Sequence, residues 1–172
     1  MKSWFVFVLF FAISTTAFPQ TDPEQKLKEL KIELPAAGKP LANYVKYVRT
    51  GNLIYLAGDG PVRADGSFIT GKLGKELTVE QGYEAARLTG INMLSTLKDA
   101  TGDLKKVKRI VKVLGLVNCT EDFKDQPKVL NGFSDLMVAV FGENGKHARS
   151  AVGAYALPFG IAIEVEMIVE VE

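Results

Sequence analysis

The chain has 172 residues, of which 47% are hydrophobic and 24% are charged, proportions that are typical of one soluble domain with a hydrophobic core. Its 21 Lys and Arg residues nearly balance its 20 Asp and Glu residues, so no strong overall field favours nucleic acid or an anionic membrane as a partner. A single Cys and a single His exclude an internal disulfide and leave too few ligands for a dedicated zinc site.

The N-terminus differs in composition from the rest of the chain. Lys2 is followed by the apolar run 4–13 (WFVFVLFFAI) and by the small residues that lead to Ala17. This pattern is typical of a cleavable secretory signal, and the run is shorter than the roughly 20 residues that span a bilayer. We expect a signal peptide over residues 1–20, with an uncleaved anchor as the alternative. The mature protein is then exported to the periplasm or the medium, with no stable membrane insertion.

Residues 21–40 form a lead-in to the domain that we expect over residues 41–172. Leu27, Leu30 and Ile32 alternate with Lys and Glu in a short amphipathic pattern that Pro35 ends. We therefore expect a short helix packed on the domain.

The first half of the domain predicts two strands followed by a long helix. Residues 44–49 alternate, Gly51 and Asn52 form a turn signal, and residues 53–57 continue as a more buried strand. A short return strand is expected over residues 67–70. Thr78 and Gln81 have the spacing of a capping box, so a helix is expected from there to about residue 100, where Thr101-Gly102 ends it.

The second half predicts three strands and one more helix. Residues 107–117 are nearly continuous apolar and β-branched residues, which predicts a central strand covered on both faces. A helix follows Asp125 and stops at Gly142, and strands are expected over residues 150–156 and 161–171. The order of elements favours an α+β domain with helices on one face of a mixed sheet.

The last strand has two chemically different faces. Its odd-numbered positions from Ile161 to Val171 are all apolar, whereas Glu164, Glu166 and Glu170 share the other face. Helices should cover the apolar face. The Glu-rich face is either solvated or turned toward a partner subunit.

Most isolated candidates for chemistry favour a structural role. Cys119 ends an apolar strand and is expected to be a packing residue. Asn118 begins an Asn-Cys-Thr glycosylation pattern, but its place in the strand favours a structural role. His147 has no nucleophile elbow near it, and we expect it to be a solvated loop residue. The glycines around Asp59 are more typical of a turn than of a phosphate-binding loop.

Arg149 is harder to assign to packing. It precedes a run of small and apolar residues, SAVGAYA, and a guanidinium at the entry to a buried strand needs an anion. A structural salt bridge to the Glu-rich face of the last strand and a ligand carboxylate are both compatible with this position.

Three segments together resemble a known family. YVKYVRTGNLIYLAGDGP, VLNGFSDLM and ARSAVGAYALPFGIAIEVEMIVEV resemble the YjgF/RidA family, also called endoribonuclease L-PSP, over about residues 32–172. The segments DQPKVLNGFSDLM and GKHARSAVG are similar to its longer, less characterised subgroup. The resemblance implies a chorismate-mutase-like α+β fold with two helices on one face of a mixed sheet, and a homotrimer with clefts between its subunits.

The resemblance also implies an activity and a set of site residues. Characterised members hydrolyse reactive enamines and imines to 2-keto acids and ammonia without a metal or an organic cofactor. Arg149 matches the arginine that grips the substrate carboxylate, and Glu164 matches the glutamate that positions or activates water. The remaining expected substrate-binding residues are Asn131, Gly58, Ala151 through its backbone, and Tyr44 from the neighbouring subunit.

The chain departs from the family pattern at several positions, which keeps other functions open. The usual Ser-Gly-Gln segment is Ala57-Gly58-Asp59 here, so a hydroxyl is lost and an extra carboxylate could weaken the binding of an anion. Gly153 and Asn43 also replace other residues. A non-catalytic trimer that binds small carboxylates or proteins is therefore the alternative, and ribonuclease activity is a third possibility, against which the balanced charge and the single His argue.

Overall fold

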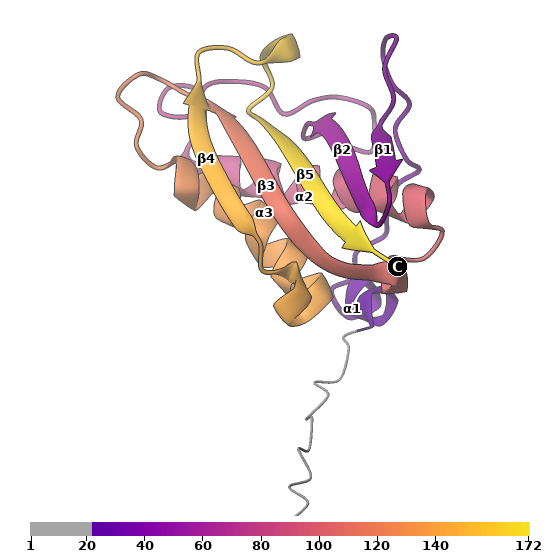
Figure 1. The fold of residues 1–172 in the computed structure, drawn as a ribbon. Helices are drawn as coiled ribbons and strands as arrows, with labels where there is room; N and C mark the ends of the chain where they lie inside the picture. Colours follow the sequence, from indigo (N-terminus) through magenta and orange to yellow (C-terminus); the bar gives the residue numbers. More distant parts are fainter. Residues whose placement is uncertain (1–21) are drawn as a thin grey trace, which may run out of the picture.

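Five strands form one mixed sheet in the order β1-β2-β5-β3-β4 (Figure 1). The computed structural model describes residues 22–172, so the expected signal peptide lies outside the described residues. The strands are β1 (Tyr47–Thr50), β2 (Leu53–Asp59), β3 (Val107–Asn118), β4 (Ala148–Ala154) and β5 (Ile163–Val171), and the helices are α1 (Pro23–Glu29), α2 (Val79–Thr101) and α3 (Gln126–Phe141). Short 3-10 turns, η1 (Leu104–Lys106), η2 (Gly142–Gly145) and η3 (Pro158–Gly160), join them.

The strand directions follow from the connections. β1 and β2 form a hairpin, and β5 lies antiparallel between β2 and β3. β4 pairs only with β3 and runs parallel to it. A parallel pair needs a crossover, which α3 and η2 supply. β4 is therefore an edge strand placed directly beside α3.

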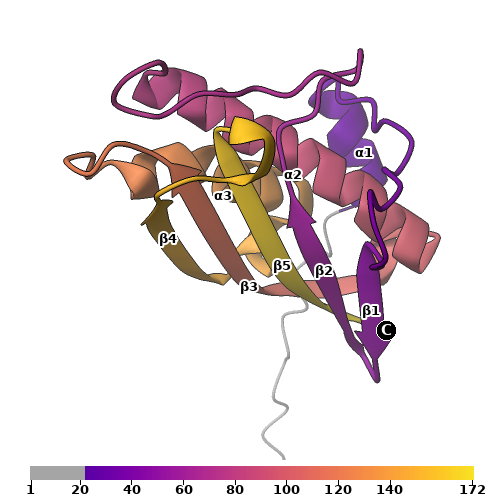
Figure 2. The ribbon, with the colours of Figure 1, turned by 90° about the horizontal axis from the view of Figure 1, so that it is seen from above.

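Both long helices lie on the same side of the sheet (Figure 2). The predicted capping box is present, because the Thr78 side chain accepts from the Gln81 backbone and the Gln81 side chain accepts from the Thr78 backbone. The helix ends at Gly102, whose φ of 74° is left-handed, as a glycine cap allows. α1 is fixed by the burial of Leu27 and by ion pairs from its first turn to Lys98 and Lys105.

The two faces of β5 confirm the sequence pattern. Ile163, Val165, Met167, Val169 and Val171 are all buried beneath the helices. The even-numbered positions lie on the opposite face, which we call the open face of the sheet. No helix covers this face in the described residues (Figure 2).

Three local predictions were wrong. Helices cover β3 on one face only, and Leu114 and Leu116 on the open face keep partial exposure. Residues 67–70 form isolated bridges instead of a strand. β4 begins at residue 148, two residues before the expected start, and β5 begins at residue 163. Among residues 22–172, no helix combines the length and the apolar character needed to cross a membrane.

The structural roles expected for Asn118 and Cys119 agree with the structure. Asn118 is buried, and its amide nitrogen donates to the backbone oxygen of Ile161 at 3.1 Å. Cys119 is a buried free cysteine of the core. The glycosylation pattern is thus part of the protein interior, where its asparagine holds the loop before β5.

Candidate functional site

Arg149 is the second residue of the edge strand β4, and its side chain lies against α3. Its Nη1 donates to Asn131 Oδ1 at 2.9 Å and to Ser134 Oγ at 3.0 Å. These two bonds use both hydrogens of Nη1. Arg149 forms no ion pair within residues 22–172, and residues 1–21 contain no Asp or Glu. Within the described part of one chain, Arg149 therefore makes no salt bridge to the Glu-rich face of the last strand.

The rest of the guanidinium is available to a ligand. Nε and Nη2 have no hydrogen-bond partner in the described part of the chain. These nitrogens form the planar fork that matches the two oxygens of a carboxylate. Because Asn131 and Ser134 hold Nη1, the fork is oriented before any ligand arrives.

His147 also differs from the sequence-based expectation, because the structure does not leave it solvated. It is half-buried, its Nδ1 lies 2.7 Å from the Gly145 backbone oxygen and its Nε2 lies 3.1 Å from Ser134 Oγ. Its ring also packs edge-on against Phe133. Burial lowers the pKa of His147, and the positive charge of Arg149 lowers it further, whereas the bond to Gly145 opposes the shift. The prediction of a solvated loop residue was wrong because η2 folds back onto α3.

Glu164 lies on the open face, beside Gly58 of β2. A Cβ atom built on Gly58 would collide with the Glu164 carboxylate, so the missing side chain makes the space that the carboxylate occupies. Glu164 forms no hydrogen bond or ion pair within residues 22–172. Partial burial raises the pKa of Glu164, and the neighbouring Glu166 and Asp59 raise it further. This is the environment of a carboxylate suited to accept a proton.

Asp59, the departure that we expected to add a negative charge, has its own counterion. Its carboxylate lies 3.2 Å from Lys46 Nζ, and both side chains are at least 85% buried, with exposures of 13% and 15%. Its other oxygen accepts from the Gly60 backbone. The extra carboxylate is thus largely balanced by a lysine from the segment before β1.

The remaining expected residues are spread around the domain. Ala151 follows Arg149 by two positions in β4 and is half-buried against the core. Tyr44 lies in the segment before β1 with 44% of its surface exposed, and its hydroxyl accepts from the Leu41 backbone at 3.3 Å. No group of three or more His, Cys, Asp or Glu side chains in residues 22–172 could hold a metal ion.

Within one chain the site residues form two separate groups. Arg149 and Asn131 meet on the helix side of the sheet edge. Glu164 and Gly58 meet on the open face, because Glu164 alternates with the buried Ile163 and Val165. One chain alone therefore does not bring the expected carboxylate anchor and the expected general base together.

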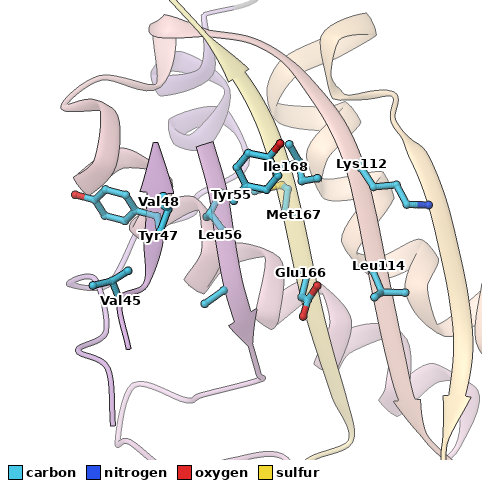
Figure 3. A pocket seen from close by; sticks show the side chains of 11 residues that line it. Val45, Tyr47, Val48, Tyr55, Leu56, Lys112, Leu114, Glu166, Met167 and Ile168 are labelled. Atoms are coloured by element: carbon cyan, nitrogen blue, oxygen red, sulfur yellow. The ribbon is translucent and has the colours of Figure 1, made fainter. Parts of the chain in front are cut away.

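The open face carries a shallow apolar groove between β1 and β3 (Figure 3). Val45, Val48 and Tyr55 there are 58%, 55% and 43% exposed, which is high for side chains of this kind. Figure 3 shows Glu166 and Lys112 as the polar groups at the β5 and β3 side of the groove.

Comparison with known families identifies the fold. The model of the family described as "YjgF/chorismate mutase-like, putative endoribonuclease" matches residues 24–171. The chain belongs to the YjgF family. This result confirms the resemblance carried by the three sequence segments and the chorismate-mutase-like α+β fold.

Relatives of this YjgF-family chain come from distant organisms. It is 47% identical to the protein TCP17 of Trypanosoma cruzi over 145 residues, which cover 84% of this chain and 91% of the relative. A solved structure of unknown function from Agrobacterium tumefaciens is 40% identical, with a TM-score of 0.81, and the match covers 87% of this chain and 92% of that one. RidA from a Psychrobacter species is 25% identical with a TM-score of 0.56, over 78% of this chain and 94% of its own.

Sequence reasoning missed three residues of this YjgF-family site: Lys46, Ser134 and His147. Ser134 could have been found, because it follows Asn131 by three positions on a predicted helix and so shares its face. His147 and Lys46 carry no such local signal. Their roles depend on η2 packing against α3 and on the segment before β1 reaching Asp59.

Proposed function

We propose that this YjgF-family chain is an enamine/imine deaminase that converts small imino acids to 2-keto acids and ammonia. The observation that carries the proposal is the Arg149 guanidinium, which two side chains orient and no carboxylate of the chain neutralises. A substrate carboxylate would complete it through Nε and Nη2. Binding in this way would place the reactive C=N carbon at a defined position.

The reaction does not require a strong protein nucleophile, because an imine carbon is already electrophilic. Glu164 takes a proton from water while the water oxygen bonds to the imine carbon and the C=N electrons move to nitrogen. The nitrogen then takes up the proton from Glu164, and the new hydroxyl passes its own proton to the nitrogen as the C–N bond breaks, so that ammonia leaves, the hydroxyl oxygen becomes the keto oxygen and Glu164 is again a carboxylate. The raised pKa of Glu164 suits both steps.

A site of this kind needs more than one subunit. Arg149 and Glu164 face opposite sides of the sheet, so we propose a homotrimer in which Arg149 of one subunit meets Glu164 and Tyr44 of its neighbour. The exposed apolar side chains of the open face support this arrangement, since burying them between subunits stabilises the assembly.

The experiment is ammonia release from 2-aminoacrylate generated in situ by a serine dehydratase. We expect the wild-type chain to accelerate release over spontaneous hydrolysis. Arg149→Ala should abolish the acceleration, and Arg149→Lys, which keeps the charge but loses the fork, should reduce it by about tenfold or more. Circular dichroism controls for folding. A wild-type rate equal to the spontaneous rate contradicts the proposal, and carboxylate binding without turnover would favour a non-catalytic binding module.

Ribonuclease activity has less support from the site. RNA cleavage commonly uses one acid and one base, and the single His147 already has both ring nitrogens engaged. The nearly neutral chain also offers no excess of basic residues for a phosphate backbone.

A further inference from the structure

The hydrogen bonds behind Arg149 form a chain with a defined direction. The Gly145 backbone oxygen can only accept, so the hydrogen of a neutral His147 lies on Nδ1. His147 Nε2 is then an acceptor, and the Ser134 hydroxyl donates to it. The same Ser134 oxygen accepts from Arg149 Nη1. Arg149 and His147 therefore share one hydroxyl oxygen.

We propose that Ser134 and His147 are positioning residues that couple carboxylate binding at Arg149 to the uptake of a proton by His147. The inference rests on the carboxylate site of the proposed function and names its regulation. With an empty site, the positive charge of the guanidinium opposes a second positive charge on the other side of Ser134. A bound carboxylate adds a negative charge beside the guanidinium and so weakens this opposition.

Other charges near His147 are already paired. On η2 and just after it, Glu143 and Lys146 form an ion pair of 2.7 Å with each other. On α3, the carboxylate of Asp135 accepts from the Tyr83 hydroxyl at 3.0 Å. Arg149 of β4 is the charge that acts on the pKa of His147, which lies below the ordinary value of 6.5. Burial is the larger cause of the lowered pKa, and Arg149 is the charged group that adds to it.

Thermodynamic linkage fixes the sign of the effect. If a bound carboxylate raises the pKa of His147, protonation of His147 must strengthen carboxylate binding by the same factor. Affinity should thus increase as the pH falls through the range in which His147 titrates. A coupling in the usual range corresponds to about a fivefold change in Kd.

The experiment uses the fact that His147 is the only histidine of the chain. With a purification tag that contains no histidine, its imidazole gives the only ring signals of this type in an NMR titration. We expect the pKa of His147 to rise when 2-oxobutanoate saturates the protein. We also expect the Kd of 2-oxobutanoate to fall about fivefold as the pH is lowered from about 7.5 through the range below 6.5 in which His147 titrates.

Four variants test whether His147 is the group that takes up the proton when a carboxylate binds. His147→Gln should remove the pH dependence of Kd, and Ser134→Ala should weaken it, whereas Ser134→Thr, which keeps the hydroxyl, should retain it. Glu164→Gln removes the other carboxylate with a raised pKa, so the pH dependence that persists in this variant should be the part due to His147. If a His147 variant does not fold, the wild-type titration still decides.

The possible failures can be told apart. An unchanged His147 titration with 2-oxobutanoate bound, or a pH dependence lost in Glu164→Gln alone, overturns the coupling and leaves the deaminase proposal standing. Coupled binding without turnover supports the inference and overturns only the deaminase. Wild-type protein that does not bind 2-oxobutanoate overturns both.

Discussion

Gly58 and Glu164 form a pair in which the absence of one side chain positions another. The Glu164 carboxylate occupies the space that a Cβ on Gly58 would need. The obstacle is the mobile end of a side chain and not backbone, so Glu164 can move away at little cost in stability. The sequence predicted both residues as site residues through the family resemblance, but their contact needed the register of β2 against β5.

We expect Gly58→Ala to separate activity from stability. Displacing the Glu164 carboxylate should lower kcat for 2-aminoacrylate hydrolysis by about 100-fold, the loss that a small misplacement of a reacting group can cause. The free energy of unfolding should change by less than about 1 kcal/mol. Steady-state kinetics and urea denaturation of the same preparation measure both.

Gly60→Ala is the matched control for that change. A Cβ there would meet the Ile161 side chain instead of Glu164, so it should affect stability more than kcat. Wild-type kcat in the G58A variant would show that the position of Glu164 is not needed for turnover.

At the scale of elements, α3 both packs closely against α2 and carries the side chains that orient Arg149. One side carries Asn131 and Ser134 toward Arg149, and Gly132 lies where α3 approaches the backbone of α2 at Tyr83. The packing of α3 on α2 thus determines where the arginine partners lie. The helix itself was predictable from its apolar spacing, whereas its close contact at Gly132 was not.

Gly132→Ala should be among the most destabilising single changes in the domain. An added Cβ would collide with the Tyr83 backbone oxygen, and two helix backbones cannot yield as a side chain can. We expect a loss of about 3 kcal/mol in the free energy of unfolding, measured by urea denaturation. Val138→Ala on the exposed side of α3 serves as control and should cost less than about 1 kcal/mol. Equal effects of the two changes would contradict the close packing.

At the scale of the whole molecule, the question is whether the two groups of candidate site residues can share one site. In one chain, Arg149 and Glu164 occupy opposite faces of the sheet. The apolar groove lies on the open face (Figure 3), and the alternation along β5 puts Glu164 on the same face. A contact between subunits is the arrangement that uses both observations.

Mixed assemblies test this arrangement directly. Arg149→Ala and Glu164→Gln should each be inactive alone, but co-expressed subunits should recover about a quarter of the wild-type sites, where an intact Arg149 happens to face an intact Glu164. Native mass spectrometry confirms that mixed trimers have formed. Mixed trimers without recovered activity would mean that the two residues do not share a site between subunits.

Local chemistry accounts for most of what the amino-acid sequence predicts here. The capping box at Thr78, the two faces of β5 and the stop at Gly102 each depend on residues within one or two turns or along one strand, so a short window contains the information. The prediction that Arg149 needs an anion also came from a short window, because a charge that enters a buried strand is costly. The structure makes β4 a partly exposed edge strand and gives the guanidinium two neutral partners.

Contacts between elements that are far apart in the sequence could not be predicted from a short window of residues. Which residues orient Arg149, why His147 is half-buried, and how Lys46 balances Asp59 all depend on how β4, α3, η2 and the segment before β1 pack together. The single-sided cover of β3 is of the same kind, since continuous apolar character cannot distinguish a second helix layer from a neighbouring subunit. Only the tertiary structure decides these contacts, because many partners are chemically compatible and the packing determines which of them lie close enough to interact.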